Sequence, residues 1–76
     1  MDRHPNLVKL GAQIRVLRKA AGYSQESFAY SIGMARAYFG GVERGDRNIA
    51  ALNLIKIAKA LNVEVGQLFP QGNELQ

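Results

Sequence analysis

The sequence predicts an all-α fold in which five short helices enclose one small core. Apolar residues recur at steps of three and four along most of the chain, which is the spacing of one helical face. Serine, asparagine, glycine and proline, which start or stop helices, fall between these periodic segments. With 76 residues, the chain has room for one domain. We expect this domain over residues 7–69, after a mobile N-terminus at 1–6 and before a frayed tail at 70–76.

The composition excludes several classes of protein. Hydrophobic residues make up 47% and charged residues 21%, an ordinary balance for a globular domain. No apolar run approaches the roughly 20 residues that span a bilayer, and residues 1–9 lack the apolar segment of a signal peptide. Cysteine is absent, which excludes disulfides and thiolate metal sites. We therefore expect a soluble, cytoplasmic protein that does not bind membranes and is stabilised by packing.

The charge balance is basic, with ten Lys and Arg against six Asp and Glu and a net charge of +4. A small basic domain is attracted to the phosphates of nucleic acid. A surplus of this size is also compatible with plain solubility, so charge alone leaves both interpretations open.

The first helix is predicted from Leu7 to Ala21, with Asn6 as its cap and Gly22 at its end. Its inward face carries the apolar residues of this segment: Leu7, Leu10, Ile14, Leu17 and Ala21. Arg18 lies at the flank of this stripe, so we expect its head group to meet a partner inside the fold. The other basic residues are expected on the solvated surface of the helix: Lys9, Arg15 and Lys19.

Two short helices follow, from Ser24 to Ile32 and from Ala35 to Glu43, with Gly33 in the tight turn between them. Their lengths and apolar spacing are those of a helix-turn-helix over residues 24–43. Ser24 can cap the first helix, and Gly33 supplies the positive φ of the turn. The residues expected to face the core are Phe28, Ala29, Ile32, Phe39 and Val42.

Gly40 and Gly41 lie inside the second of these helices, on sides that face away from the core. Glycine costs roughly 0.8 to 1 kcal/mol per residue in a helix interior relative to alanine. Two interpretations remain open. Bare backbone lets the helix lie close against a partner, or the helix is merely weak and frays toward Gly45.

A fourth helix is predicted from Ala50 to Leu61, and the segment VEVGQLF after it predicts a last short helix. The residues expected to face the core are Leu54, Ile57, Ala58 and Leu61, joined by Val65, Leu68 and Phe69. Leu52 points away from the apolar face of the fourth helix, and Ile55 lies between that face and Leu52. One flank of this helix is therefore more apolar than a monomer needs.

Three stretches carry a resemblance to a known family: YSQESFAYSIG, VERGDRN and NLIKIAKALNVEVGQLF. Together they resemble the lambda-repressor-like helix-turn-helix family, the Cro and repressor type of bacterial and phage transcriptional regulators. The resemblance covers residues 7–69, and the run RAYFGGVERGDRN is most similar to small controller regulators of restriction-modification operons. It implies a five-helix DNA-binding domain that binds palindromic double-stranded DNA as a homodimer.

The resemblance also assigns roles to residues of this sequence. Base edges in the major groove would be met by the start of the 35–43 helix: Ala35, Arg36 and Ala37. The DNA backbone would be met by the first residue of the preceding helix and by the loop after the recognition helix: Gln25, Arg44, Arg47 and Asn48. Arg18 and Glu43 would form a structural ion pair. At Gly41, relatives often read a base with a side chain, which this chain lacks.

The chemistry of the exposed helix end leaves some of these roles open. Arg36 can make a bidentate contact to guanine, or it can clamp a phosphate. Ala37 offers a methyl group to a thymine methyl. Tyr38 can contact the sugar-phosphate backbone, or it can pack half-buried in the fold. Ala35 replaces the usual capping residue, so this helix start has no side-chain cap.

A palindromic operator requires a second copy of the chain. One domain this small reads about four base pairs, too few to single out a site, and two-fold pairing doubles that length. The candidates for the dimer surface are Leu52, Ile55 and Val65. Each could instead be ordinary core or an isolated exposed residue.

Enzyme function is not expected. His4 is the only histidine, no acid-base arrangement is evident, and nothing suggests a cofactor, a metal ion or a small-molecule ligand. We expect a bacterial or phage-encoded regulator, nucleoid-associated when bound. The alternative is an antitoxin-like or other protein-interaction module on the same fold. RNA binding is less favoured, because the few aromatic residues are expected to be buried.

Overall fold

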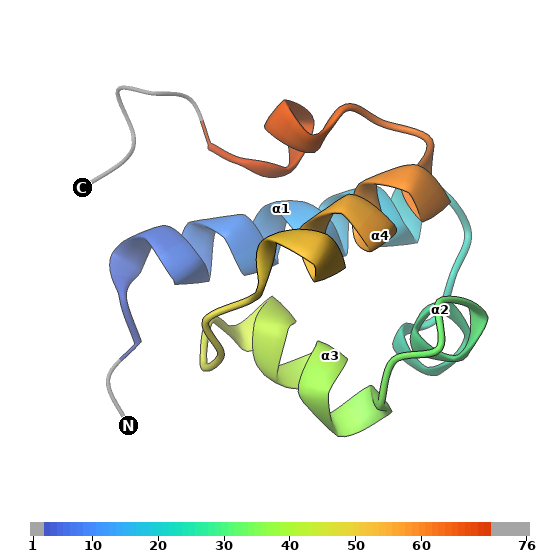
Figure 1. Ribbon diagram of the computed structural model, residues 1–76, viewed down its shortest axis with the longest axis horizontal. Helices are drawn as coiled ribbons and strands as arrows, with labels where there is room; N and C mark the ends of the chain where they lie inside the picture. The colour runs from blue at the N-terminus through green and yellow to red at the C-terminus, as the bar shows by residue number, and fades with distance from the viewer. Residues whose placement is uncertain (1–2, 71–76) are drawn as a thin grey trace.

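The computed structural model describes residues 3–70 and contains four α-helices and a 3-10 turn (Figure 1). The elements in chain order are α1 (Pro5–Ala20), α2 (Gln25–Ser31), α3 (Arg36–Arg44), α4 (Ala51–Leu61) and η1 (Val65–Leu68). Residues 3–70 hold no strand, so the predicted all-α class is confirmed. The predicted last short helix is present as η1, a 3-10 helix of four residues and not an α-helix. Of the tail expected at 70–76, residues 71–76 lie outside the described residues.

Helix α1 begins two residues earlier than predicted. Pro5 occupies the first helical position, where its missing N–H costs nothing and its fixed φ suits the helix. The cap is His4, whose Nδ1 accepts a hydrogen bond of 3.0 Å from the backbone N–H of Asn6. The prediction of Asn6 as the cap is therefore wrong. Residues 5 and 6, expected in a mobile N-terminus, form the first turn of α1.

The helix-turn-helix forms where it was predicted. Ser24 caps α2, and its hydroxyl accepts from the backbone N–H of Ser27 at 3.0 Å. Gly33 turns the chain with a φ of +67°, and the N–H of Met34 donates back to the carbonyl of Ala29. Helix α3 then starts one residue later than predicted, with Ala35 as a cap that makes no side-chain hydrogen bond.

The core is enclosed by all four helices and η1. Its buried hydrophobic residues are Leu10, Ile14, Phe28, Ala29, Phe39, Val42, Ile49, Ile57, Ala58, Leu61 and Leu68. The rings of Phe28 and Phe39 lie 5.2 Å apart at its centre. Ile49 was missed because it lies in a loop outside any helical repeat. Ala21 and Phe69 were predicted to face the core. Both predictions are wrong, because Ala21 is exposed and Phe69 is 39% exposed.

Helix α3 packs against α1 and α2, and Gly11 of α1 lies at the crossing. A Cβ at this glycine would lie 2.3 Å from the carbonyl oxygen of Val42, so no larger residue fits without moving the backbone. This close approach fixes where α3 lies. Across the described residues, no helix is long and apolar enough to cross a membrane.

Candidate nucleic-acid interface

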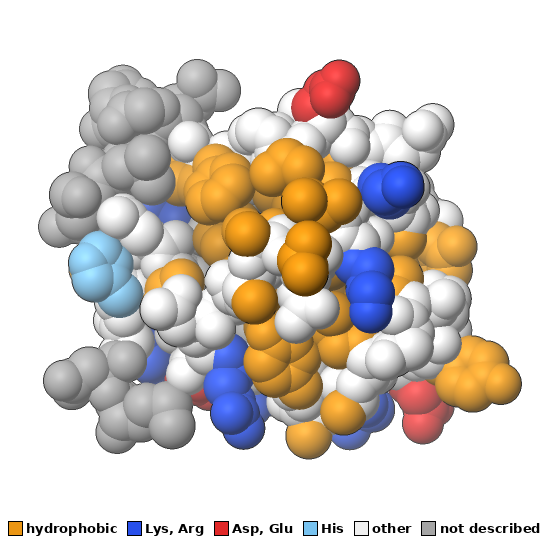
Figure 2. Space-filling view, viewed as in Figure 1, with side chains coloured by type: hydrophobic (Ala, Val, Ile, Leu, Met, Phe, Trp, Pro, Cys, Tyr) orange, Lys and Arg blue, Asp and Glu red, His pale blue; other side chains and the backbone are white. Residues whose placement is uncertain are grey.

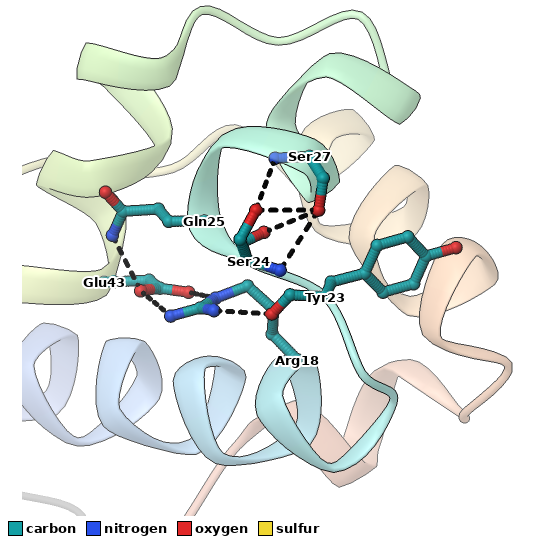
Figure 3. Close-up of polar contacts among 6 residues, drawn as sticks. All are labelled: Arg18, Tyr23, Ser24, Gln25, Ser27 and Glu43. Carbon is teal, nitrogen blue, oxygen red and sulfur yellow. Dashed lines mark hydrogen bonds and ion pairs between the residues drawn. The ribbon is translucent and has the colours of Figure 1, made fainter.

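A buried ion pair joins α1 to the end of α3. Arg18 Nε lies 2.7 Å from Glu43 Oε2, and Arg18 Nη2 donates to Glu43 Oε1 at 3.1 Å (Figure 3). Arg18 Nη1 donates to the carbonyl oxygen of Tyr23 at 2.8 Å. The two side chains are only 6% and 3% exposed. This is the pair that the resemblance implied, and Arg18 was expected inside the fold from its place at the flank of the apolar stripe.

Gln25 extends this pair to α2. Its Nε2 donates to Glu43 Oε1 at 2.9 Å, so one carboxylate receives hydrogen bonds from two helices (Figure 3). A buried charge is tolerated only when paired and hydrogen-bonded, and both oxygens of Glu43 are satisfied here. The cluster therefore fixes α1, α2 and α3 relative to one another. The second N–H of the Gln25 amide makes no hydrogen bond with a described residue.

The N-terminal end of α3 projects from the fold. Ala35, Arg36 and Ala37 are all exposed, and the structure brings them together at one helix end. Arg36 makes no hydrogen bond or ion pair with any described residue. Because Ala35 gives no side-chain cap, the first N–H groups of α3 also lack a side-chain acceptor. This end can therefore donate hydrogen bonds to an acceptor-rich partner.

The position of Tyr38 is compatible with both of the roles considered for it. Its ring is half-buried and packs against the core. Its hydroxyl oxygen accepts a hydrogen bond from Asn53 Nδ2 at 3.3 Å. The hydroxyl proton can still be donated outward, so packing and a backbone contact are compatible.

The double glycine is buried, which corrects the expectation that it faces outward. A Cβ at Gly41 would lie 2.8 Å from Arg47 Cγ, and a Cβ at Gly40 would lie 3.2 Å from Gln25 Oε1 and 3.3 Å from Arg44 Nη1. The side chains of three polar residues thus cover this part of α3. The bare backbone brings polar side chains of the same chain close to the helix, and α3 is regular through both glycines. The alternative of a weak helix that frays toward Gly45 is therefore not needed to explain Gly40 and Gly41.

The loop after α3 holds a shared carboxylate. Asp46 Oδ2 lies 2.8 Å from Arg44 Nε, and its Oδ1 lies 3.1 Å from Arg3 Nε. Arg3 also donates to the carbonyl oxygen of Arg44. The hydrogen bond from Arg44 and the positive charges of Arg3 and Arg44 lower the pKa of the Asp46 carboxyl. Arg47 and Asn48 follow as exposed residues.

Arg3 is a site residue that sequence reasoning missed. It lies 41 residues from Arg44, in a segment that was assigned to a mobile N-terminus. No local pattern couples these positions, since neither periodicity nor capping acts over such a separation. The contact places a fourth arginine beside the face that presents Arg36, Arg44 and Arg47.

The residues predicted for a dimer surface divide into two groups. Leu52 is 77% exposed and Ile55 is 43% exposed, and both lie on α4. Val65 is half-buried and packs against the core from η1. Figure 2 shows hydrophobic side chains gathered over the middle of the face on which α4 lies. An apolar surface for a partner is therefore present, and Val65 offers only part of its side chain to it.

In the described part of the chain, no group of three His, Asp or Glu side chains could hold a metal ion. His4 serves as the cap of α1. The titratable groups near α3, Glu43 and Asp46, are each paired with arginines.

Known proteins that are similar to this chain agree with the helix-turn-helix seen in the structure. A helix-turn-helix family model matches residues 14–68. Among known proteins, the chain is similar to Control protein C.MunI of a Mycoplasma species, with 38% identity over 63 residues that cover 82% of this chain and 85% of that protein.

Two solved structures resemble the arrangement of helices over most of the chain. C.AhdI, a restriction-modification controller protein from Aeromonas hydrophila, is 51% identical with a TM-score of 0.80, covering 83% of this chain and 96% of that one. The restriction-modification controller protein C.Esp1396I, a tetramer in complex with its natural 35-base-pair operator, is 34% identical with a TM-score of 0.72. The match to C.Esp1396I covers 82% of this chain and 82% of that chain.

Proposed function

We propose, because this chain belongs to the helix-turn-helix family of transcriptional regulators, that it binds a palindromic operator as a homodimer with α3 in the major groove. The observation that carries the proposal is the exposed start of α3, which projects from a fold that locks the rest of that helix. A helix of this width fits the major groove of B-DNA, where each base pair presents a distinct pattern of donors and acceptors.

Sequence readout falls mainly to Arg36. Its guanidinium has no partner among the described residues and can donate two parallel hydrogen bonds to guanine O6 and N7. Such a pair gives about 1 to 3 kcal/mol of discrimination against the wrong base. Ala35 and Ala37 lie beside it and offer methyl groups to the groove. With one long side chain at this end, readout is narrow, and DNA shape contributes to the choice of site.

The residues around α3 position it on the DNA backbone. Those that can meet phosphate are Gln25, Tyr38, Arg44, Arg47 and Asn48. Each carries an N–H or O–H donor, and phosphate contacts of this kind fix register without carrying sequence information. Arg47 and Gln25 lie against the bare backbone of Gly41 and Gly40, which keeps both side chains close to the recognition helix.

In a homodimer, the second chain reads the second half of the operator. An isologous contact through Leu52 and Ile55 would remove an exposed apolar surface from water and relate two α3 helices by a two-fold axis. Val65 would complete the edge of that contact from η1. The tetramer of C.Esp1396I on its operator supports assembly of more than one chain on DNA.

The regulated genes are proposed to be those of a restriction-modification system. This rests on the similarity to the control proteins C.MunI and C.AhdI over most of both chains. A purified dimer should protect a short palindromic site whose half-site centres lie about 34 to 36 Å apart, or a multiple of that distance. Its affinity should fall steeply as salt is raised. Equal affinity for all duplexes at low salt would contradict the proposal, and an absence of salt-dependent DNA binding would favour a protein-interaction module.

A further inference from the structure

A groove runs between α1 and the helix-turn-helix, beside the face assigned to DNA. Its volume is about 390 Å³. One wall is α1, and the other is formed by the ends of α2 and α3, with Arg3 at one end. The side chains that line it are Arg3, Val8, Ala12, Arg15, Val16, Gln25, Glu43 and Arg44.

The rim of this groove is cationic. Arg3, Arg15 and Arg44 line it, and the single carboxylate among its lining residues is Glu43. That carboxylate is 3% exposed and is paired with Arg18, so it offers no negative charge to a ligand. Arg15 was expected to be an ordinary solvated residue. It makes no hydrogen bond or ion pair with any described residue, so its guanidinium is available to an anion.

The floor of the groove is apolar. Val8, Ala12 and Val16 follow one another at steps of four along α1, and all three are exposed. Val16 is 60% exposed, and the packing of the fold does not require an apolar side chain at this position. An apolar strip between arginines matches the sugar-phosphate backbone of DNA, in which apolar deoxyribose carbons alternate with anionic phosphates.

The groove is continuous with the proposed interface. Gln25 and Arg44 line it, and both are also among the residues proposed to meet phosphates. We infer that the groove receives a stretch of DNA backbone adjoining those phosphates, and that Arg3 and Arg15 each bind a phosphate there. This inference rests on the proposed function and extends its DNA contact to α1. The loop carboxylate of Asp46 keeps Arg3 beside Arg44 in the unbound protein.

Salt dependence of binding to a random-sequence duplex tests the inference directly, because the slope of log affinity against log salt counts the phosphates neutralised. Each contact contributes about 0.9 to that slope on B-DNA. Arg15→Ala and Arg3→Ala should each reduce its magnitude by about 0.9, whereas Arg15→Lys should keep it. Lys59→Ala removes the same charge from α4 and should leave the slope at the wild-type value. Arg15→Ala should also keep the wild-type melting temperature, because no intramolecular hydrogen bond or ion pair of the side chain is lost.

The outcomes separate this inference from the proposed function. If the wild type binds DNA with a steep slope and Arg15→Ala behaves like Lys59→Ala, the inference is overturned and the function stands. If the wild type shows no salt-dependent binding, both fail. An acidic peptide would match the same charges, so binding of a polyglutamate peptide that Arg15→Ala abolishes, with an unchanged DNA slope, would assign the groove to a protein and overturn the inference.

Discussion

Arg18 of α1 and Glu43 of α3 meet inside the fold with 2.7 Å between Nε and Oε2. Their contact links the scaffold to the helix proposed to read DNA, and Gln25 joins them from α2. The orientation of the helix-turn-helix is therefore set by polar contacts as well as by the apolar core.

Removal of one partner of this pair should strongly destabilise the protein. Glu43→Ala leaves Arg18 buried with an unpaired charge, and breaking a buried pair in this way costs about 3 to 5 kcal/mol. Urea denaturation followed by circular dichroism measures the free energy of unfolding. Arg15→Ala, on the exposed side of the same helix, is the control and should stay within about 0.5 kcal/mol of the wild type. Similar stability for the two variants would contradict a structural role for the pair.

Gly41→Ala should weaken DNA binding without unfolding the protein. The new Cβ would lie 2.8 Å from Arg47 Cγ, so the arginine stem must move away from α3. Alanine favours the helix by about 0.8 to 1 kcal/mol, which offsets part of that cost. Melting temperature and operator affinity should be measured together. Gly66→Ala is the matched control, because nothing lies within 4 Å of its added Cβ. Wild-type affinity for Gly41→Ala would show that the position of Arg47 is unimportant.

Asp46 should make a small, pH-dependent contribution to stability. Its pKa is lowered in the folded state by the hydrogen bond from Arg44 and by the charge of Arg3. The unfolded chain then binds more protons than the folded one between the two pKa values, so stability rises with pH across that window. The contribution is complete above the ordinary aspartate pKa and is lost as pH falls through the folded-state value.

An NMR titration of the Asp46 carboxyl checks this directly. Its midpoint should lie below that of an ordinary aspartate and should rise toward it in Arg44→Ala. The stability effect should shrink at high salt, because the carboxyl remains partly accessible to solvent. An unchanged midpoint in Arg44→Ala would contradict the assignment of Arg44 as the main cause.

Much of the fold could be predicted because its signals are local. Ser24 and Gly33 act through their own caps and dihedral angles, and the apolar spacing of α2 to α4 repeats within each helix. The place of Arg18 at the flank of a stripe also indicated an internal partner. What could not be predicted depends on segments distant in sequence. Periodicity shows which face of a helix is apolar, but it does not show what covers the other faces.

Three features of the site illustrate this limit. Arg3 reaches Arg44 across 41 positions, so no helical or turn pattern connects them. The double glycine of α3 is buried under side chains from α2 and the following loop, which its own sequence context does not reveal. The cationic groove beside Arg15 is lined by residues of α1, α2 and α3, and helical periodicity does not show that these segments meet.

Leu52→Ser should weaken self-association. Leu52 is 77% exposed, and placing it in a dimer contact would bury apolar surface worth about 1.5 to 3 kcal/mol per large side chain. Sedimentation equilibrium should show a dissociation constant raised by roughly tenfold or more, since 1.4 kcal/mol is a factor of ten. Tyr30→Ser removes an exposed side chain from α2 and should leave association unchanged. Equal dissociation constants for the two variants would exclude this surface from the dimer.

The most direct test of base reading by α3 is to sequence the DNA that the wild type and Arg36→Ala each recover from a random pool of duplexes. A palindromic consensus is expected for the wild type. For Arg36→Ala, preference should be lost at one symmetric pair of positions, equivalent to about 1 to 3 kcal/mol per contact, and kept elsewhere. A consensus with no symmetry, or an identical consensus for both proteins, would contradict base reading by the exposed end of α3.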